Sequence, residues 1–124
     1  MSIQAYQRAS AQGETPREAE YRLFALITSG LIRASESRKN ISGLAEALHQ
    51  NRRLWSLLAQ DCADPENTLP KPLRAQIISL SLWVSRHTSA VMRDGSDIEP
   101  LIEVNRSVMQ GLAPGAHAPL AAVG

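Results

Sequence analysis

The residue types that most often carry chemistry are few and scattered in this sequence. The three histidines, His49, His87 and His117, fall on separate segments, and no spacing joins them to carboxylates as a metal site requires. His87 belongs to a regular apolar pattern, which favours a partly buried structural histidine over a catalytic base. We therefore expect no catalytic residue, no metal site and no cofactor.

Cys62 is the only cysteine, so the chain cannot form an internal disulfide, which fits a reducing compartment. It lies near a predicted helix C-terminus and close to Asp64, and both features disfavour a thiolate. We interpret it as a small core residue. The sequence also has no CxxC, HExxH, P-loop or GxGxxG motif, and its serines have no paired base at triad-like positions. These observations predict a binding protein and not an enzyme.

Two polar features stand next to apolar residues and suggest recognition. Arg52 and Arg53 precede Leu54 and Trp55, which is typical either of a solvated helix face with one core tryptophan or of an interaction hot spot. Asn105 interrupts an apolar helix face, where it either fixes the packing register or hydrogen-bonds a ligand. We favour the register role for Asn105.

Length, composition and charge limit the class of protein. A chain of 124 residues is one domain long, and its residues are 44% hydrophobic but only 4% aromatic. The net charge of +1 argues against a dedicated nucleic-acid binder, which normally carries a basic excess. No apolar run approaches the ~18 residues of a membrane span, and the N-terminus does not resemble a signal peptide. We expect a cytoplasmic protein without membrane insertion.

Local signals predict four main helices. A capping box over Thr15–Glu18 begins the first, which we expect to run to about Arg38. The second carries an apolar stripe from Ile41 to Cys62. The third begins at Pro72 or just after it and ends before Gly95. The fourth follows a second predicted capping box, Ser96–Glu99, and ends near Leu112.

The third helix shows the most regular pattern. It repeats apolar positions at alternating spacings of four and three, which is typical of a helix packed along a neighbour: Leu73, Ile77, Leu80, Val84, His87 and Val91. We expect this face to be core, so that Leu80→Asp would unfold the protein. Ile78 and Leu82 form a smaller patch on the opposite side, where a partner could bind.

The predicted fold is all-α: a four-helix, bundle-like single domain with a short N-terminal arm and a disordered C-terminal tail. The domain is expected to cover residues 1–112, and the flexible Ala/Pro/Gly tail residues 113–124.

Several segments together resemble the FlaF family, the flagellar biosynthesis regulators of alphaproteobacteria. The resemblance spans about residues 2–112, and it is carried by 5–7, 20–24, 51–55, 73–80, 83–88, 101–106 and 109–112. It implies a role in making or exporting flagellin, a direct interaction with flagellin of export-chaperone type, and opposition to a second regulator, FlbT. The segments after Ala113 and between Ser35 and Gly43 lie outside the matched motifs.

The resemblance and the residues together lead to two hypotheses. In the first, the protein binds flagellin as a secretion chaperone or adaptor and so promotes flagellin synthesis and export; an all-helical protein can offer a groove to an amphipathic helix. In the alternative, it regulates flagellin expression after transcription, with or against a FlbT-type regulator or through flagellin mRNA. Binding to RNA would require a basic face, which forms if the following arginines converge: Arg52, Arg53, Arg86, Arg93 and Arg106. The candidate partner-binding residues are Arg52, Arg53, Trp55, Ile78, Leu82, Trp83, Arg86, Asn105 and Arg106.

Overall fold

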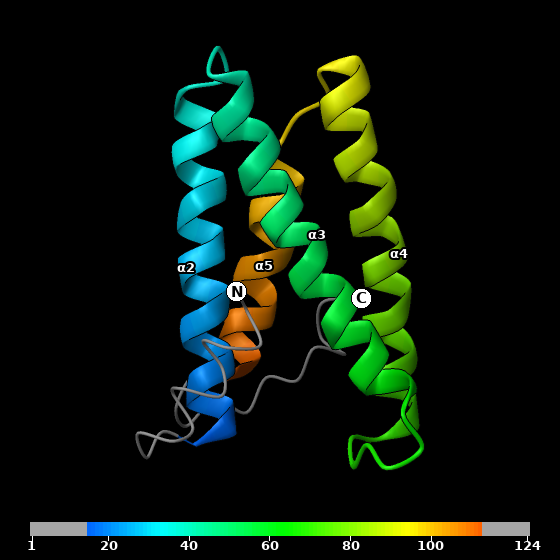
Figure 1. Cartoon of the computed structure of the whole chain (residues 1–124). Coiled ribbons are helices and arrows are strands. Elements are labelled where there is room, and N and C mark those ends of the chain that lie inside the picture. Colours follow the sequence, from blue (N-terminus) through cyan, green and yellow to red (C-terminus); the bar gives the residue numbers. More distant parts are fainter. Residues whose placement is uncertain (1–14, 113–124) are drawn as a thin grey trace.

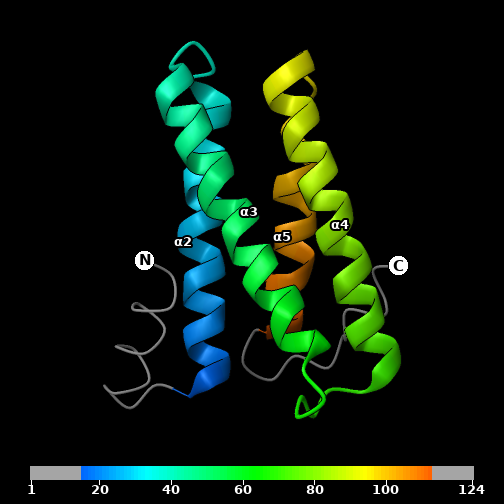
Figure 2. The same ribbon diagram turned by 45° about the vertical axis from the view of Figure 1, so that its right-hand side comes forward.

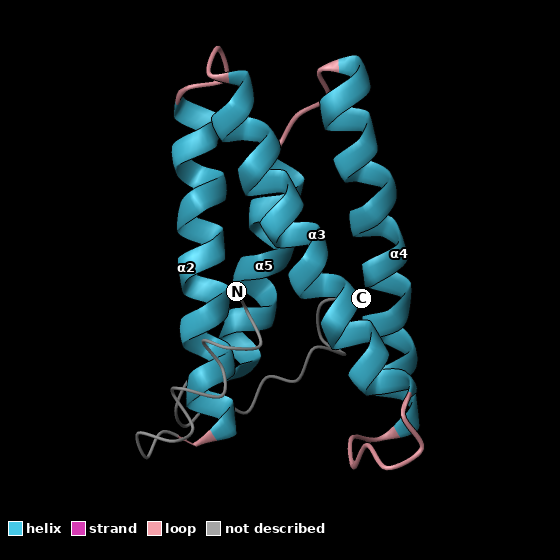
Figure 3. Cartoon of the chain, viewed as in Figure 1, coloured by secondary structure: helices cyan, strands magenta, loops and turns pink. Residues whose placement is uncertain are grey.

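A computed structural model describes residues 15–112, and this part of the chain forms four helices and no strand (Figure 1, Figure 3). The helices are α2 (Pro16–Glu36), α3 (Ile41–Ala63), α4 (Lys71–Asp94) and α5 (Glu99–Leu112). The predicted all-α, four-helix, bundle-like fold is confirmed. The predicted N-terminal arm and C-terminal tail lie outside the described residues. Within 15–112, every helix is too short or too polar to cross a membrane.

The start of α2 is the predicted capping box. The Thr15 hydroxyl accepts a hydrogen bond from the Glu18 backbone N–H at 3.1 Å, and the Glu18 carboxylate accepts one from the Thr15 N–H at 3.0 Å. Pro16 fits the first helical position because no partner is needed for its missing N–H. The helix ends at Glu36, two residues before the predicted Arg38, and its predicted apolar face is buried.

Two further boundaries follow from local geometry. Asn40 caps α3 by accepting from the Gly43 N–H at 3.1 Å, and a Cβ at Gly43 would lie 2.6 Å from the Asn40 side chain. Glycine therefore lets the cap approach the helix closely. Gly95 ends α4 with φ of 68°, a left-handed conformation that glycine adopts without strain.

The predicted capping box of α5 is wrong. The Ser96 N–H bonds to the Ala90 carbonyl at 3.4 Å, so Ser96 belongs to the end of α4 and is not the cap of the next helix. Asp97 takes that role, because its carboxylate accepts from the Glu99 N–H at 3.0 Å. The α4–α5 connection, residues 95–98, is consequently short.

The helices do not form a closed square. α3 crosses the molecule diagonally, packs beside α2 near its start and beside α4 along its second half (Figure 1, Figure 2). α5 packs against α2. By contrast, α4 and α5 touch at few points and diverge away from the turn that joins them. Among the described helices, α4 therefore has one close neighbour, α3.

This arrangement corrects the predicted core face of α4. The buried positions are Ile77, Val84, Thr88 and Val91, whereas Leu73, Leu80 and His87 are only half-buried. Ser81 faces α3, where its hydroxyl donates to the Trp55 carbonyl at 3.2 Å. The buried residues lie between this α3-facing side and the side of Leu80 and Trp83, which faces α5.

The first residue of the predicted α3 stripe also lies outside the core. Ile41 is 64% exposed because it occupies the first turn, beyond the reach of the neighbouring helices.

Candidate functional site

A polar network lies at the centre of the core and joins three helices. Asn105 of α5 accepts from the Trp55 indole N–H at 2.8 Å and donates to Asn51 Oδ1 at 2.7 Å, both on α3. It also donates to the Thr28 hydroxyl of α2 at 3.1 Å. Asn51 and Asn105 are fully buried. An amide with these three partners holds the helices in one register, which supports the structural interpretation of Asn105.

The same network decides the position of Trp55. Its side chain is 1% exposed and packs edge-on against Phe24, with ring centroids 5.9 Å apart. Trp55 and Asn105 were candidate partner-binding residues, but the structure places both inside the core. Their burial removes them from the surface that a partner can contact.

The two neighbouring arginines of α3 have different environments. Arg52 reaches α4, where its Nη2 donates to the Ser85 carbonyl at 2.9 Å and to the Ser89 hydroxyl at 2.7 Å. Arg53 is exposed. Arg52 therefore links α3 to α4 through hydrogen bonds. Of the two arginines, Arg53 is the one that is exposed to solvent.

The remaining candidate arginines and the small apolar patch lie on the surface. Arg86 is exposed on α4, and Arg106 pairs with Glu103 one turn earlier on α5 at 3.3 Å. Leu82 is 58% exposed, whereas Ile78 is half-buried and packs against the core. The Ile78–Leu82 patch thus offers mainly one apolar side chain to a partner.

A shallow groove between α4 and α5 offers more apolar side chains than the Ile78–Leu82 patch. It is open to solvent, has a volume of about 630 Å³, and is lined by Leu80, Trp83, Asp97, Glu99, Pro100, Glu103, Val104 and Ser107. Leu80, Trp83 and Val104 are half-buried and rest on the core. Among the candidate residues, only Trp83 lines this groove. The sequence offered no signal for the rest, because the groove exists only where α4 and α5 diverge.

The Trp83 ring has a fixed position on the wall of the groove. It stacks on the His87 ring with centroids 5.0 Å apart and an interplanar angle of 11°. His87 Nε2 lies 2.6 Å from the Asp97 carbonyl oxygen, a hydrogen bond that ties α4 to the turn before α5. His87 is half-buried, as predicted, and it positions the tryptophan.

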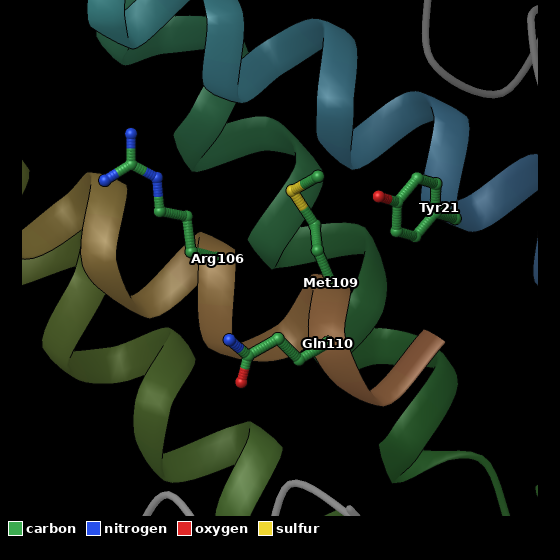
Figure 4. A pocket seen from close by; sticks show the side chains of 4 residues that line it. All are labelled: Tyr21, Arg106, Met109 and Gln110. Atoms are coloured by element: carbon green, nitrogen blue, oxygen red, sulfur yellow. The ribbon is translucent and has the colours of Figure 1, made fainter. Parts of the chain in front are cut away.

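A second, smaller hollow of about 240 Å³ lies between α2 and α5. In Figure 4, Tyr21 reaches into it from α2, and Arg106, Met109 and Gln110 come from α5. Its wall is mixed in polarity and is formed by few side chains. It therefore provides less apolar contact area than the α4–α5 groove.

One cysteine of the core has a shifted pKa. Cys62 is buried, and burial, with a smaller contribution from Asp61, raises the pKa of its thiol. This confirms the interpretation of Cys62 as a core residue, since a nucleophile needs the opposite shift. No three His, Cys, Asp or Glu side chains between residues 15 and 112 cluster as metal ligands.

Comparison with known proteins agrees with the resemblance seen in the residues. The family model described as flagellar protein FlaF matches residues 2–112, which is most of the chain. Neither the curated proteins nor the solved structures contain a match. The match to the family model covers all four helices and the groove between α4 and α5, and the chain therefore belongs to the FlaF family of flagellar proteins.

Proposed function

We propose that this FlaF protein is a non-enzymatic cytoplasmic chaperone or adaptor that binds flagellin and thereby promotes flagellin synthesis and export. Flagellin has amphipathic terminal segments that need shielding before export, and an open apolar groove can provide it. The single observation that supports the proposal is the α4–α5 groove, with its half-buried apolar floor of Leu80, Trp83 and Val104.

The dimensions of the groove suit a helical segment. Along α5 its lining extends from Glu99 to Ser107, which at 1.5 Å per residue is about 12 Å, or roughly two helical turns. Recognition of this kind uses anchors spaced three or four residues apart on the bound helix. We expect a short amphipathic stretch to be covered and the rest of the partner to remain outside.

Copurification with flagellin tests the proposal. We expect full-length flagellin to bind and flagellin without its terminal segments not to bind. Absence of binding to the full-length protein would refute the proposal. Binding to a FlbT-type regulator without binding to flagellin would replace it with a protein–protein regulator.

Two neighbouring residues on α4 locate the surface. Trp83→Ala should weaken flagellin binding, because it removes the wall of the groove. Leu82→Ala changes an exposed residue that does not line the groove, and it should leave binding unchanged. The reverse pattern would move the site to the Ile78–Leu82 patch.

Direct action on flagellin mRNA has less support. Arg52 is used in the contact with α4, and Arg106 and Arg93 each pair with a neighbouring carboxylate. Phosphate binding would have to break these contacts. A gel shift on the flagellin leader RNA at low salt would favour this alternative, and we expect none.

A further inference from the structure

We propose that the α4–α5 groove selects an amphipathic helix whose apolar stripe is flanked by lysine or arginine. This inference rests on the proposed function, since it specifies the chemistry of the segment that the groove receives. It follows from the open side of the helix arrangement, the apolar floor and the charge of the rim.

The open side comes from the packing of the helices. Among the described helices, α2 packs with α3 and α5, and α3 packs with α4, but α4 and α5 make few contacts with each other. Figure 1 shows that they diverge below the segment that joins them. A closed four-helix bundle would have a fourth contact there. A helix from a partner that lies between α4 and α5 restores that missing contact without any change in the other three.

The floor of the groove is apolar and preorganised. Leu80 and Trp83 come from α4, and Pro100 and Val104 from α5, so a bound helix touches both walls. His87 holds the Trp83 ring by stacking and is itself held by the Asp97 carbonyl. A side chain that is already held in place loses little entropy on binding. The occupant must therefore present an apolar stripe to this floor.

The rim of the groove has one sign of charge. Asp97, Glu99 and Glu103 are exposed lining residues, and no lysine or arginine is among the lining residues. The Asp97 carboxylate also caps α5, and Glu103 forms an exposed ion pair with Arg106. Glu99 forms no ion pair with another described residue. Cations beside the apolar stripe of a partner match this rim, and carboxylates there are repelled.

Two synthetic peptides test the inference with the full-length protein. Both form amphipathic helices with the same leucine and alanine stripe, flanked by lysine in one and by glutamate in the other. Fluorescence anisotropy should show about tenfold tighter binding of the lysine peptide, the effect of two or three partly screened ion pairs. Raising the salt concentration should reduce this preference.

Charge-reversal variants locate the preference. Glu99→Lys with Glu103→Lys should abolish or invert it, whereas Glu36→Lys with Glu46→Lys makes the same change of net charge on α2 and α3 and should preserve it. The neutral pair Glu99→Gln with Glu103→Gln should reduce the preference if the reversed pair does not fold. Equal binding of both peptides, no binding of either, or a preference that survives both rim variants would overturn the inference.

Failure of the inference is distinguishable from failure of the proposed function. Flagellin binding that is unaffected by the rim variants, together with peptides that bind equally, would retain the chaperone proposal and remove charge selection. A clear preference for the lysine peptide without any binding of flagellin would retain charge selection by the groove and refute the chaperone proposal.

Discussion

The indole nitrogen of Trp55 lies 2.8 Å from Oδ1 of Asn105, and this hydrogen bond joins α3 to α5 inside the core. The two residues are 50 positions apart, and both are almost completely buried. Asn105 also donates to Asn51 and Thr28, so that one amide connects three helices. A buried network of this kind favours a single arrangement of the helices, because separating them would leave the Trp55 N–H and the Asn105 amide without these partners.

Replacement of the central amide should therefore be costly. Asn105→Leu has a similar volume, but it leaves the Trp55 N–H, the Thr28 hydroxyl and the Asn51 oxygen without their partner. We expect the free energy of unfolding to fall by about 3 kcal/mol or more in urea denaturation. Gln110→Leu, at an exposed amide of the same helix, should change it by less than about 0.5 kcal/mol. Equal effects of the two variants would show that the network does not stabilise the fold.

The attachment of α4 to α3 can be tested with two adjacent arginines. Arg52→Ala removes two hydrogen bonds to α4 and should lower the free energy of unfolding by about 1–2 kcal/mol. Arg53→Ala changes an exposed neighbour and should have almost no effect. Urea denaturation followed by circular dichroism measures both. A stable Arg52→Ala variant would mean that these bonds do not hold α4 in place.

The buried face of α4 differs from the face that the sequence pattern predicts, and this leads to opposite expectations for two of its apolar residues. Val84 is fully buried, so Val84→Asp should unfold the protein, because a buried carboxylate costs several kcal/mol. Leu80 is half-buried at the groove, so Leu80→Asp should remain folded, in contrast to the expectation from the sequence pattern. Thermal melts monitored at 222 nm distinguish the two. Loss of the helical signal in Leu80→Asp would place that residue in the core.

The capping box of α2 predicts a pH dependence. Hydrogen bonds from the Thr15 backbone N–H and the Thr15 side chain lower the pKa of Glu18 below its usual value of 4.5. A lowered pKa in the folded state means that the contribution of Glu18 to stability is complete above pH 4.5 and is lost as the pH falls through the lowered value. The difference in melting temperature between the native protein and Glu18→Ala should therefore shrink below pH 4.5. A difference that stays constant from pH 7 to pH 3 would contradict this.

Burial of Cys62 predicts slow alkylation. The thiol is 2% exposed and has a raised pKa, so iodoacetamide at pH 8 should label it much more slowly in the native protein than in denaturing urea. Cys62→Ala combined with Ala63→Cys moves the thiol to the exposed neighbouring position, where native labelling should be fast. Mass spectrometry measures both rates. Fast native labelling of Cys62 would show that α3 opens there.

Local chemistry was sufficient to place the helices. The capping box at Thr15 and Glu18 and the left-handed Gly95 involve residues close together in the chain, so their signals are readable without tertiary information. The apolar face of α2 was also predicted correctly, because two helices, α3 and α5, pack against that helix and bury the whole face. The register role of Asn105 followed from a polar residue on an apolar face, although its partners did not.

The orientation of α4 and the groove were decided only by tertiary packing. A helical repeat shows that a helix has an apolar side, but the neighbours determine which part of that side is buried. Among the described helices α3 is the one close neighbour of α4, so that Ser81 faces this contact, Thr88 is buried, and Leu80 remains at the edge of the groove with Trp83. The divergence of α4 from α5 depends on contacts between residues far apart in the chain, and a pattern within one helix contains no information about them.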